Sequence, residues 1–101
     1  MRQACAAGLG LILALPLAAQ GQDMGRKVFT EVAQPSCALC HTLESAGAVG
    51  TIGPSLDELK PDKARVLDTV RTGIGPMPPY EGKLTPEQIQ AVADYVADAV
   101  K

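Results

Sequence analysis

The sequence has few aromatic residues: two tyrosines, one phenylalanine and no tryptophan. Aromatic side chains bury much apolar surface, so their scarcity limits the core that the protein can build by itself. A chain of 101 residues forms one small domain, and a domain of that size buries only about 60% of its unfolded surface. We therefore expect a metal, disulfides or some other substitute to complete the core.

Basic charge is also scarce. The formal net charge is −2, from nine basic and eleven acidic residues. Proteins that bind nucleic acid carry basic patches that neutralise phosphates, so this balance argues against DNA or RNA as a partner. The short length also excludes a large enzyme that catalyses several steps.

The sequence lacks an apolar run of the length and strength that a membrane span needs. Residues 4–19 are apolar, are interrupted only by Pro16, and follow the single positive charge of Arg2. A span needs about 20 strongly apolar residues, and this run is shorter and rich in alanine and glycine. A charged start, an apolar middle and small closing residues are typical of a secretion signal peptide.

We therefore predict a signal peptide at residues 1–21, cleaved after Ala19 or after Gly21, and a mature domain at residues 22–101. The alternative is a leader that stays attached as a membrane anchor. With the leader removed, the mature form has no membrane span and is periplasmic. Its only cysteines, Cys37 and Cys40, then lie in an oxidising compartment.

Cys37-Ala38-Leu39-Cys40-His41 has the C-x-x-C-H spacing through which c-type haem is attached. On a turn of helix this spacing puts both thiols on one face, where they can reach the two vinyl groups of one porphyrin, and His41 follows as a ligand of the iron. The alternatives are a redox-active cysteine pair, a disulfide and a zinc site. The pair lacks a surrounding βαβ pattern, and zinc would need a fourth ligand, which the predicted mature chain does not offer. We predict one haem c, bound covalently through Cys37 and Cys40 and ligated by His41.

Two methionines of the predicted mature domain could fill the sixth position of the iron. Met77 lies in a segment with two glycines and three prolines within seven residues, which predicts a loop. Prolines on both sides restrict its backbone and would hold its side chain in one direction. Met24 lies near the expected cleavage site, where we expect a packing residue. We predict Met77 as the ligand, and ligation by histidine and methionine favours electron transfer over ligand chemistry.

The spacing of apolar residues predicts helices at about 23–34, 61–72 and 85–100, with one more helical turn at the C-x-x-C-H motif. The last helix has a compact start signal in Thr85-Pro86-Glu87-Gln88. Residues 44–56 predict a loop, and no strand pattern of any length appears. The expected fold is all-α: three to four helices and loops around one covalently attached haem.

From Gly25 to the C-terminus, the chain resembles the small bacterial class I c-type cytochromes. Gly25 and Phe29 match the first-helix pair of that family, and Tyr95 matches the aromatic residue of its last helix. This resemblance implies that the small glycine lets the two helices cross closely and that the aromatic rings fill the contact.

The resemblance also adds residues to the site. Gly53-Pro54-Ser55-Leu56 is similar to the family's Gly-Pro-x-Leu segment, and the stretch from Gly75 to Tyr80 is similar to its distal methionine loop. It implies that the Pro54 carbonyl orients the ring of His41 and that Leu56 lies against the porphyrin. Tyr80 is expected either to shield the haem or to bond a propionate.

The family implies an electron carrier rather than an enzyme, with redox proteins as its partners. Cys37–Leu43, Gly53-Pro54, Leu56–Asp62 and Met77-Pro78 resemble the cytochromes that partner bacterial sulfite dehydrogenases. A sulfite dehydrogenase is thus the expected donor, and an oxidase or another cytochrome the expected acceptor. The alternative function is a haem-based enzyme or gas-binding protein with an open sixth position, against which the absence of a second histidine counts.

The expected helix at 61–72 and the residue before it carry a local excess of basic side chains: Lys60, Lys63, Arg65 and Arg71. A solvated helix face explains them without any further role. The alternatives are electrostatic steering of a partner and neutralisation of the haem propionates.

Overall fold

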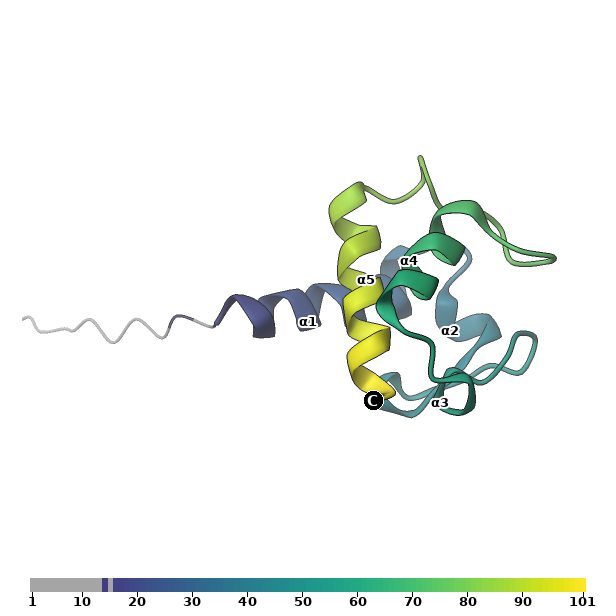
Figure 1. Ribbon diagram of the computed structural model, residues 1–101, viewed down its shortest axis with the longest axis horizontal. Coiled ribbons are helices and arrows are strands. Elements are labelled where there is room, and N and C mark those ends of the chain that lie inside the picture. Colours follow the sequence, from purple (N-terminus) through teal and green to yellow (C-terminus); the bar gives the residue numbers. More distant parts are fainter. Residues whose placement is uncertain (1–13, 15) are drawn as a thin grey trace, which may run out of the picture.

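The computed structural model describes Ala14 and residues 16–101, so most of the predicted signal peptide lies outside the described residues (Figure 1). Within the described residues, the regular elements are helices apart from one short two-stranded ladder, which confirms the all-α fold class. In chain order the elements are α1 (Leu17–Lys27), the π-helical η2 (Val28–Val32), α2 (Cys37–Cys40), β1 (Thr42–Leu43), the 3-10 turn η3 (Glu44–Ala46), β2 (Ala48–Val49), α3 (Leu56–Leu59), α4 (Lys63–Thr72) and α5 (Pro86–Ala99).

The first helix begins earlier than the sequence predicted. Helical structure runs without a break through α1 and η2, from Leu17 to Val32, whereas residues 23–34 were expected. It therefore passes through both expected cleavage points. Its end agrees better with the prediction, because the backbone is already extended at Ala33 and Pro35 follows two residues later.

α1 and α5 cross closely, and α5 lies between α1 and α4 (Figure 1). A Cβ at Gly25 would collide with the carbonyl oxygen of Ala91 and the Cβ of Tyr95, so only glycine fits at this crossing. The rings of Phe29 and Tyr95 meet edge to face, with centroids 6.2 Å apart and planes at 62°. These contacts confirm the crossing that the resemblance implied.

The starts of α4 and α5 are fixed by side-chain caps. Thr85 and Gln88 form a reciprocal capping box in front of α5, as the sequence predicted, with bonds of 3.1 and 2.9 Å. The prediction that α4 begins at Pro61 was wrong. Asp62 caps α4 by accepting a hydrogen bond from the Arg65 N–H, while Pro61 lies buried outside the helix.

Residues 44–56 were predicted to be a loop, but they include local structure. β1 and β2 pair antiparallel, with Thr42 opposite Val49 and Leu43 opposite Ala48. α3 begins at Leu56 and ends after one turn, where Lys60 adopts a left-handed conformation with φ of 49°. Elements of two to four residues are too short to show a periodic pattern, so the sequence could not predict them.

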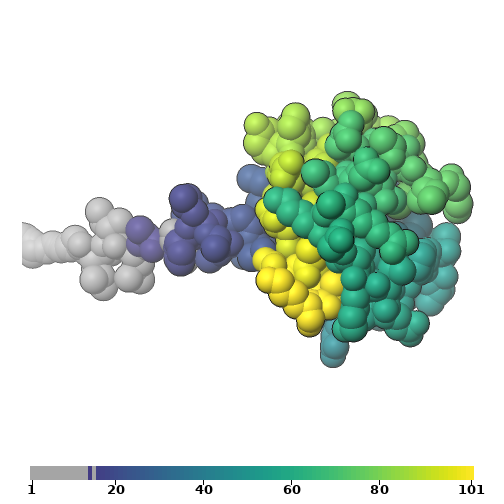
Figure 2. All heavy atoms as spheres, viewed as in Figure 1, coloured from purple at the N-terminus to yellow at the C-terminus, as the bar shows by residue number. Residues whose placement is uncertain are grey.

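The core gathers residues from η2, β1, α4 and α5, and from the segment between α4 and α5. Its largest fully buried side chains are Phe29, Leu43, Val28, Val92 and Val96. Figure 2 shows that the first part of α1 projects away from the packed body formed by α3, α4 and α5. Within the part of the chain that the structure describes, no helix is long and apolar enough to cross a membrane.

Candidate haem-binding site

The two thiols of the C-x-x-C-H motif are the first and last residues of α2, a single helical turn. Ser36 caps this turn by accepting a hydrogen bond from the Ala38 N–H at 3.2 Å, and its own hydroxyl donates to the Phe29 carbonyl at 3.1 Å. The second bond ties α2 to η2. Cys37 and Cys40 are half-buried and form no disulfide, so both thiols are free to react with an external group.

The chemistry of the thiols argues against the alternatives raised by the sequence. Burial, with a smaller contribution from the nearby Cys40, raises the pKa of Cys37 to about 11. A redox-active cysteine needs the opposite shift, because the thiolate is the nucleophile. No group of three or more histidine, cysteine, aspartate or glutamate side chains that could hold a metal ion occurs among the described residues.

His41 follows α2 directly, and its ring is fixed by the segment before α3. The Nδ1 atom lies 2.7 Å from the carbonyl oxygen of Pro54, which can only accept, so Nδ1 carries the proton and donates it. The lone pair of Nε2 is then available to a metal. The contact implied by the resemblance is therefore present.

Gly53 makes room for this ring. A Cβ at Gly53 would lie 2.7 Å from Cε1 of His41, well inside van der Waals contact. The Gly53 N–H also donates to the Cys40 carbonyl at 2.7 Å. The backbone of Gly53 and Pro54 thus forms a cradle for the imidazole. The other residue expected from this segment, Leu56, is buried in the core at the start of α3.

Met77 lies in a closed turn after α4. The Ile74 N–H donates to the Met77 carbonyl at 3.0 Å, and the Met77 N–H donates back at 2.9 Å. Gly73 enters the turn with φ of +71°, and a Cβ there would lie 2.6 Å from the Met77 carbonyl oxygen. Met77 is half-buried and packs against the core, as does Cys37. The backbone of the expected distal ligand is therefore held firmly.

Tyr80 has a partner that the sequence did not reveal. It is buried, and its hydroxyl donates to the Pro35 carbonyl at 2.6 Å, across 45 positions of sequence. Burial, together with the nearby Cys37 and Cys40, raises the pKa of Tyr80 to about 12. The phenol therefore stays protonated at physiological pH and remains a donor. The structure thus pairs this hydroxyl with backbone, whereas the sequence suggested a propionate or a shielding role.

The surface beside the motif is apolar. Leu39 lies inside the motif, β2 packs against α2, and Ile74 belongs to the Met77 turn. Four large apolar side chains in these segments and in the loop after β2 are strongly exposed: Leu39 (59%), Val49 (81%), Ile52 (69%) and Ile74 (70%). We call these four residues the apolar rim. Large exposed apolar side chains near a binding motif are typical of an interaction surface.

Two of the four basic side chains around α4, Lys63 and Arg71, are paired with acidic ones. Lys63 Nζ lies 2.9 Å from Asp94 Oδ1, and Arg71 lies 3.6 Å from both Asp68 and Glu81. These pairs favour the solvated helix face over a concentrated positive patch for steering.

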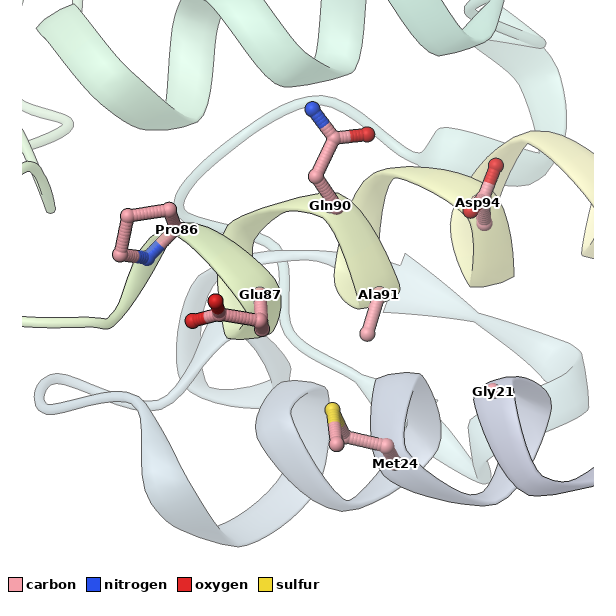
Figure 3. Close-up of a pocket in the computed structure, with 7 residues that line it drawn as sticks. All are labelled: Gly21, Met24, Pro86, Glu87, Gln90, Ala91 and Asp94. Atoms are coloured by element: carbon pink, nitrogen blue, oxygen red, sulfur yellow. The ribbon is translucent and has the colours of Figure 1, made fainter.

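Met24, the methionine not expected to bind iron, lies apart from this site. It is 46% exposed, so it does not fill the core. It lines a groove of about 400 Å³ between α1 and α5, together with residues that include Gly21, Ala91 and Asp94 (Figure 3). None of the residues that line the groove belongs to the C-x-x-C-H motif or to the Met77 turn.

Comparisons with known proteins agree with this geometry. Residues 21–96 match the family described as cytochrome c oxidase, cbb3-type, subunit III. Cytochrome c-551 of Halorhodospira halochloris is 26% identical over 76% of this chain and 99% of its own length. Cytochrome c6 of Thermosynechococcus vestitus is 33% identical over 93% of this chain and 86% of its own. The crystal structure of the c-type cytochrome SorU from Sinorhizobium meliloti is 54% identical, with a TM-score of 0.78, over 81% of this chain and 93% of that one.

Proposed function

Because this chain belongs to the class I c-type cytochromes, which are electron carriers rather than enzymes, we propose that it carries one electron on a single haem c. The haem is attached through Cys37 and Cys40, and the iron is ligated by His41 and Met77. The observation that carries this assignment is the 2.7 Å bond from His41 Nδ1 to the Pro54 carbonyl, which leaves Nε2 for the iron.

The residues present fit such a group. α2 offers two half-buried thiols that no disulfide occupies, and the Gly53 cradle fits an imidazole but not an additional methyl group. Met77, held by its closed turn, offers a soft thioether. Bound haem supplies the redox-active iron. A large apolar group at this position also explains how a chain so poor in aromatic residues completes its core.

The protein's own residues keep the site rigid during electron transfer. Pro54 prevents the His41 ring from rotating, because rotation would break the bond at Nδ1. The two backbone bonds between Ile74 and Met77 restrain the distal turn. Retaining both ligands in the oxidised and reduced states keeps structural reorganisation small, and leaves no open position for gases or peroxide.

The proposed partners are redox proteins that dock on the apolar rim. Contacts of this kind bury little area and separate quickly, which suits a carrier that must bind and release in every cycle. The resemblance of Cys37–Leu43 and Leu56–Asp62 to cytochromes that partner sulfite dehydrogenases supports such an enzyme as the donor. An oxidase or another cytochrome would accept the electron.

We place the mature protein, residues 22–101, in the periplasm after removal of a signal peptide at residues 1–21. Gln22 supports this boundary, since its side-chain amide donates to Asp98 on α5 at 3.0 Å. Cleavage after Ala19 or after Gly21 would therefore retain the α1–α5 crossing, which is centred on Gly25.

Expression with the leader and a cytochrome-maturation system in a bacterial periplasm tests the proposal. We expect a low-spin reduced haem that does not bind carbon monoxide. Met77→Ala should open the sixth position, so that carbon monoxide binds rapidly and the reduction potential falls. Visible spectra and a redox titration measure both effects.

Met24→Ala is the matched control, because it removes the other methionine of the proposed mature domain. It should leave the spectrum, the potential and the response to carbon monoxide unchanged. Rapid carbon monoxide binding by the unmodified protein would reject Met77 as a firm ligand, and would favour gas or peroxide chemistry instead.

A further inference from the structure

Tyr80 joins two parts of the proposed site that are remote in sequence. Its hydroxyl donates to the carbonyl of Pro35, two residues before Cys37, while its ring is almost completely buried. The bond spans 45 positions and, at 2.6 Å, lies at the short end of the range for a hydroxyl donor. It links the segment that follows the distal methionine to the segment that precedes the attachment motif.

The connection from Tyr80 to Met77 is stiff. Only Pro78 and Pro79 separate the two residues, and both prolines fix φ and lack an N–H. Tyr80 is also anchored through its backbone, because its N–H donates to the Val70 carbonyl at 2.8 Å. A displacement of the phenol would therefore be transmitted to Met77 rather than absorbed between them.

The other end of the bond is equally well anchored. Pro35 precedes Ser36, which caps α2 and bonds to the Phe29 carbonyl. α2 in turn carries the two thiols and leads directly into His41. The Pro35 carbonyl is thus a reference point fixed to the proximal side of the site.

We propose that Tyr80 is a positioning residue, whose hydroxyl bond to Pro35 sets the separation between the Met77 turn and the Cys37–His41 segment. It thereby keeps the thioether of Met77 on the iron. This inference rests on the proposed function, because it takes Met77 as the sixth ligand. Loss of the hydroxyl alone removes the link but keeps the ring in the core, so the distal turn can move away more often.

The test compares Tyr80→Phe with Tyr95→Phe in the full chain, matured with haem. Tyr95 is a close control, because it is also 4% exposed and its hydroxyl also forms a hydrogen bond, to Ser45 at 2.8 Å. Tyr95 lies on α5, however, and not beside Met77 in the sequence. Three quantities are measured in each variant. They are the rate of carbon monoxide binding to the reduced form, the red absorption band that a methionine sulfur produces on ferric haem iron, and the denaturant midpoint.

We expect both variants to lose a similar amount of stability, because each loses one buried hydrogen bond. Only Tyr80→Phe should also weaken the methionine-to-iron band and bind carbon monoxide faster, by about fivefold, the factor expected from one net hydrogen bond. Equal carbon monoxide rates and equal bands in the two variants would overturn the positioning role. Absence of the band from the unmodified protein would instead overturn Met77 as the ligand, which separates failure of this inference from failure of the proposed function.

Discussion

At the scale of single residues, the proposed site depends on the absence of side chains as much as on their presence. Gly53 leaves the space in which the ring of His41 lies, and the Pro54 carbonyl beside it orients that ring. A ligand whose orientation is set by backbone needs no further side chain to hold it. This explains how the single histidine of the domain can present a well-defined imidazole.

Gly53→Ala tests this reading. The added Cβ would meet His41 Cε1 at 2.7 Å, and relieving such an overlap typically costs about 1–3 kcal/mol. We expect the ring to tilt and its bond to Pro54 to weaken, with a changed reduction potential and less haem incorporated per chain. Redox titration and haem quantification measure the result. Thr51→Ala, an exposed neighbour, is the control, and equal behaviour of the two variants would refute the cradle.

At the scale of elements, the crossing of α1 and α5 holds the first and last helices of the domain together. Gly25 permits the close approach, while Phe29 and Tyr95 fill the contact next to it. α5 also packs against α4, which leads into the Met77 turn. The crossing therefore supports the site indirectly, through the packing of α5 against α4, and contributes no residue to it.

Gly25→Ala measures the value of this crossing. Alanine favours a helix by about 1 kcal/mol over glycine, yet its Cβ would collide with the Ala91 carbonyl and with Tyr95. We expect the collision to win, because backbone atoms cannot move away cheaply, with a net loss of about 1–3 kcal/mol. Denaturant unfolding of the haem-loaded protein gives the number. Asp23→Ala, at an exposed position of the same helix, should cost little, and a stabilised Gly25→Ala variant would contradict the close crossing.

At the scale of the whole molecule, the proposed function depends on an exposed apolar surface next to a rigid interior. The side chains of the apolar rim are exposed to solvent, while the basic side chains Lys63 and Arg71 are paired with acidic neighbours. We therefore expect docking of redox partners to depend mainly on apolar contact, and only weakly on long-range charge.

Val49→Asp tests the rim, since Val49 is its most exposed member at 81%. A charge within a small apolar contact must be desolvated on docking, so electron transfer from a sulfite dehydrogenase should slow several-fold while the reduction potential stays the same. Stopped-flow reduction at two salt concentrations measures the rate of electron transfer and its salt dependence, and a redox titration measures the reduction potential. Met24→Asp places the same charge beside the groove between α1 and α5 and should have no effect. Equal rates for all three proteins would exclude the rim as the docking surface.

The sequence alone determined the features that depend on short spacing. These local patterns are the C-x-x-C-H motif, the proline-flanked Met77 and the capping box of α5, because covalent geometry and helix periodicity limit where such side chains can point. The glycine at the helix crossing followed instead from the resemblance to a known family. The all-α fold class followed from the same periodicity. Two predicted helix boundaries were wrong for local reasons: helix formation continues upstream to Leu17, and α4 begins at Lys63, capped by Asp62, rather than at Pro61.

Only the tertiary structure decided the contacts that close long loops. Two hydrogen bonds join segments that no short pattern connects: Tyr80 to Pro35, and Tyr95 to Ser45. The exposure of the apolar rim likewise depends on how the whole chain packs. Such contacts form because the whole chain packs around one core. Which residues meet across a long loop therefore depends on how all the elements pack together. The sequence therefore predicts the residue types of the proposed site. The contacts that hold these residues in place can be found only in the tertiary structure.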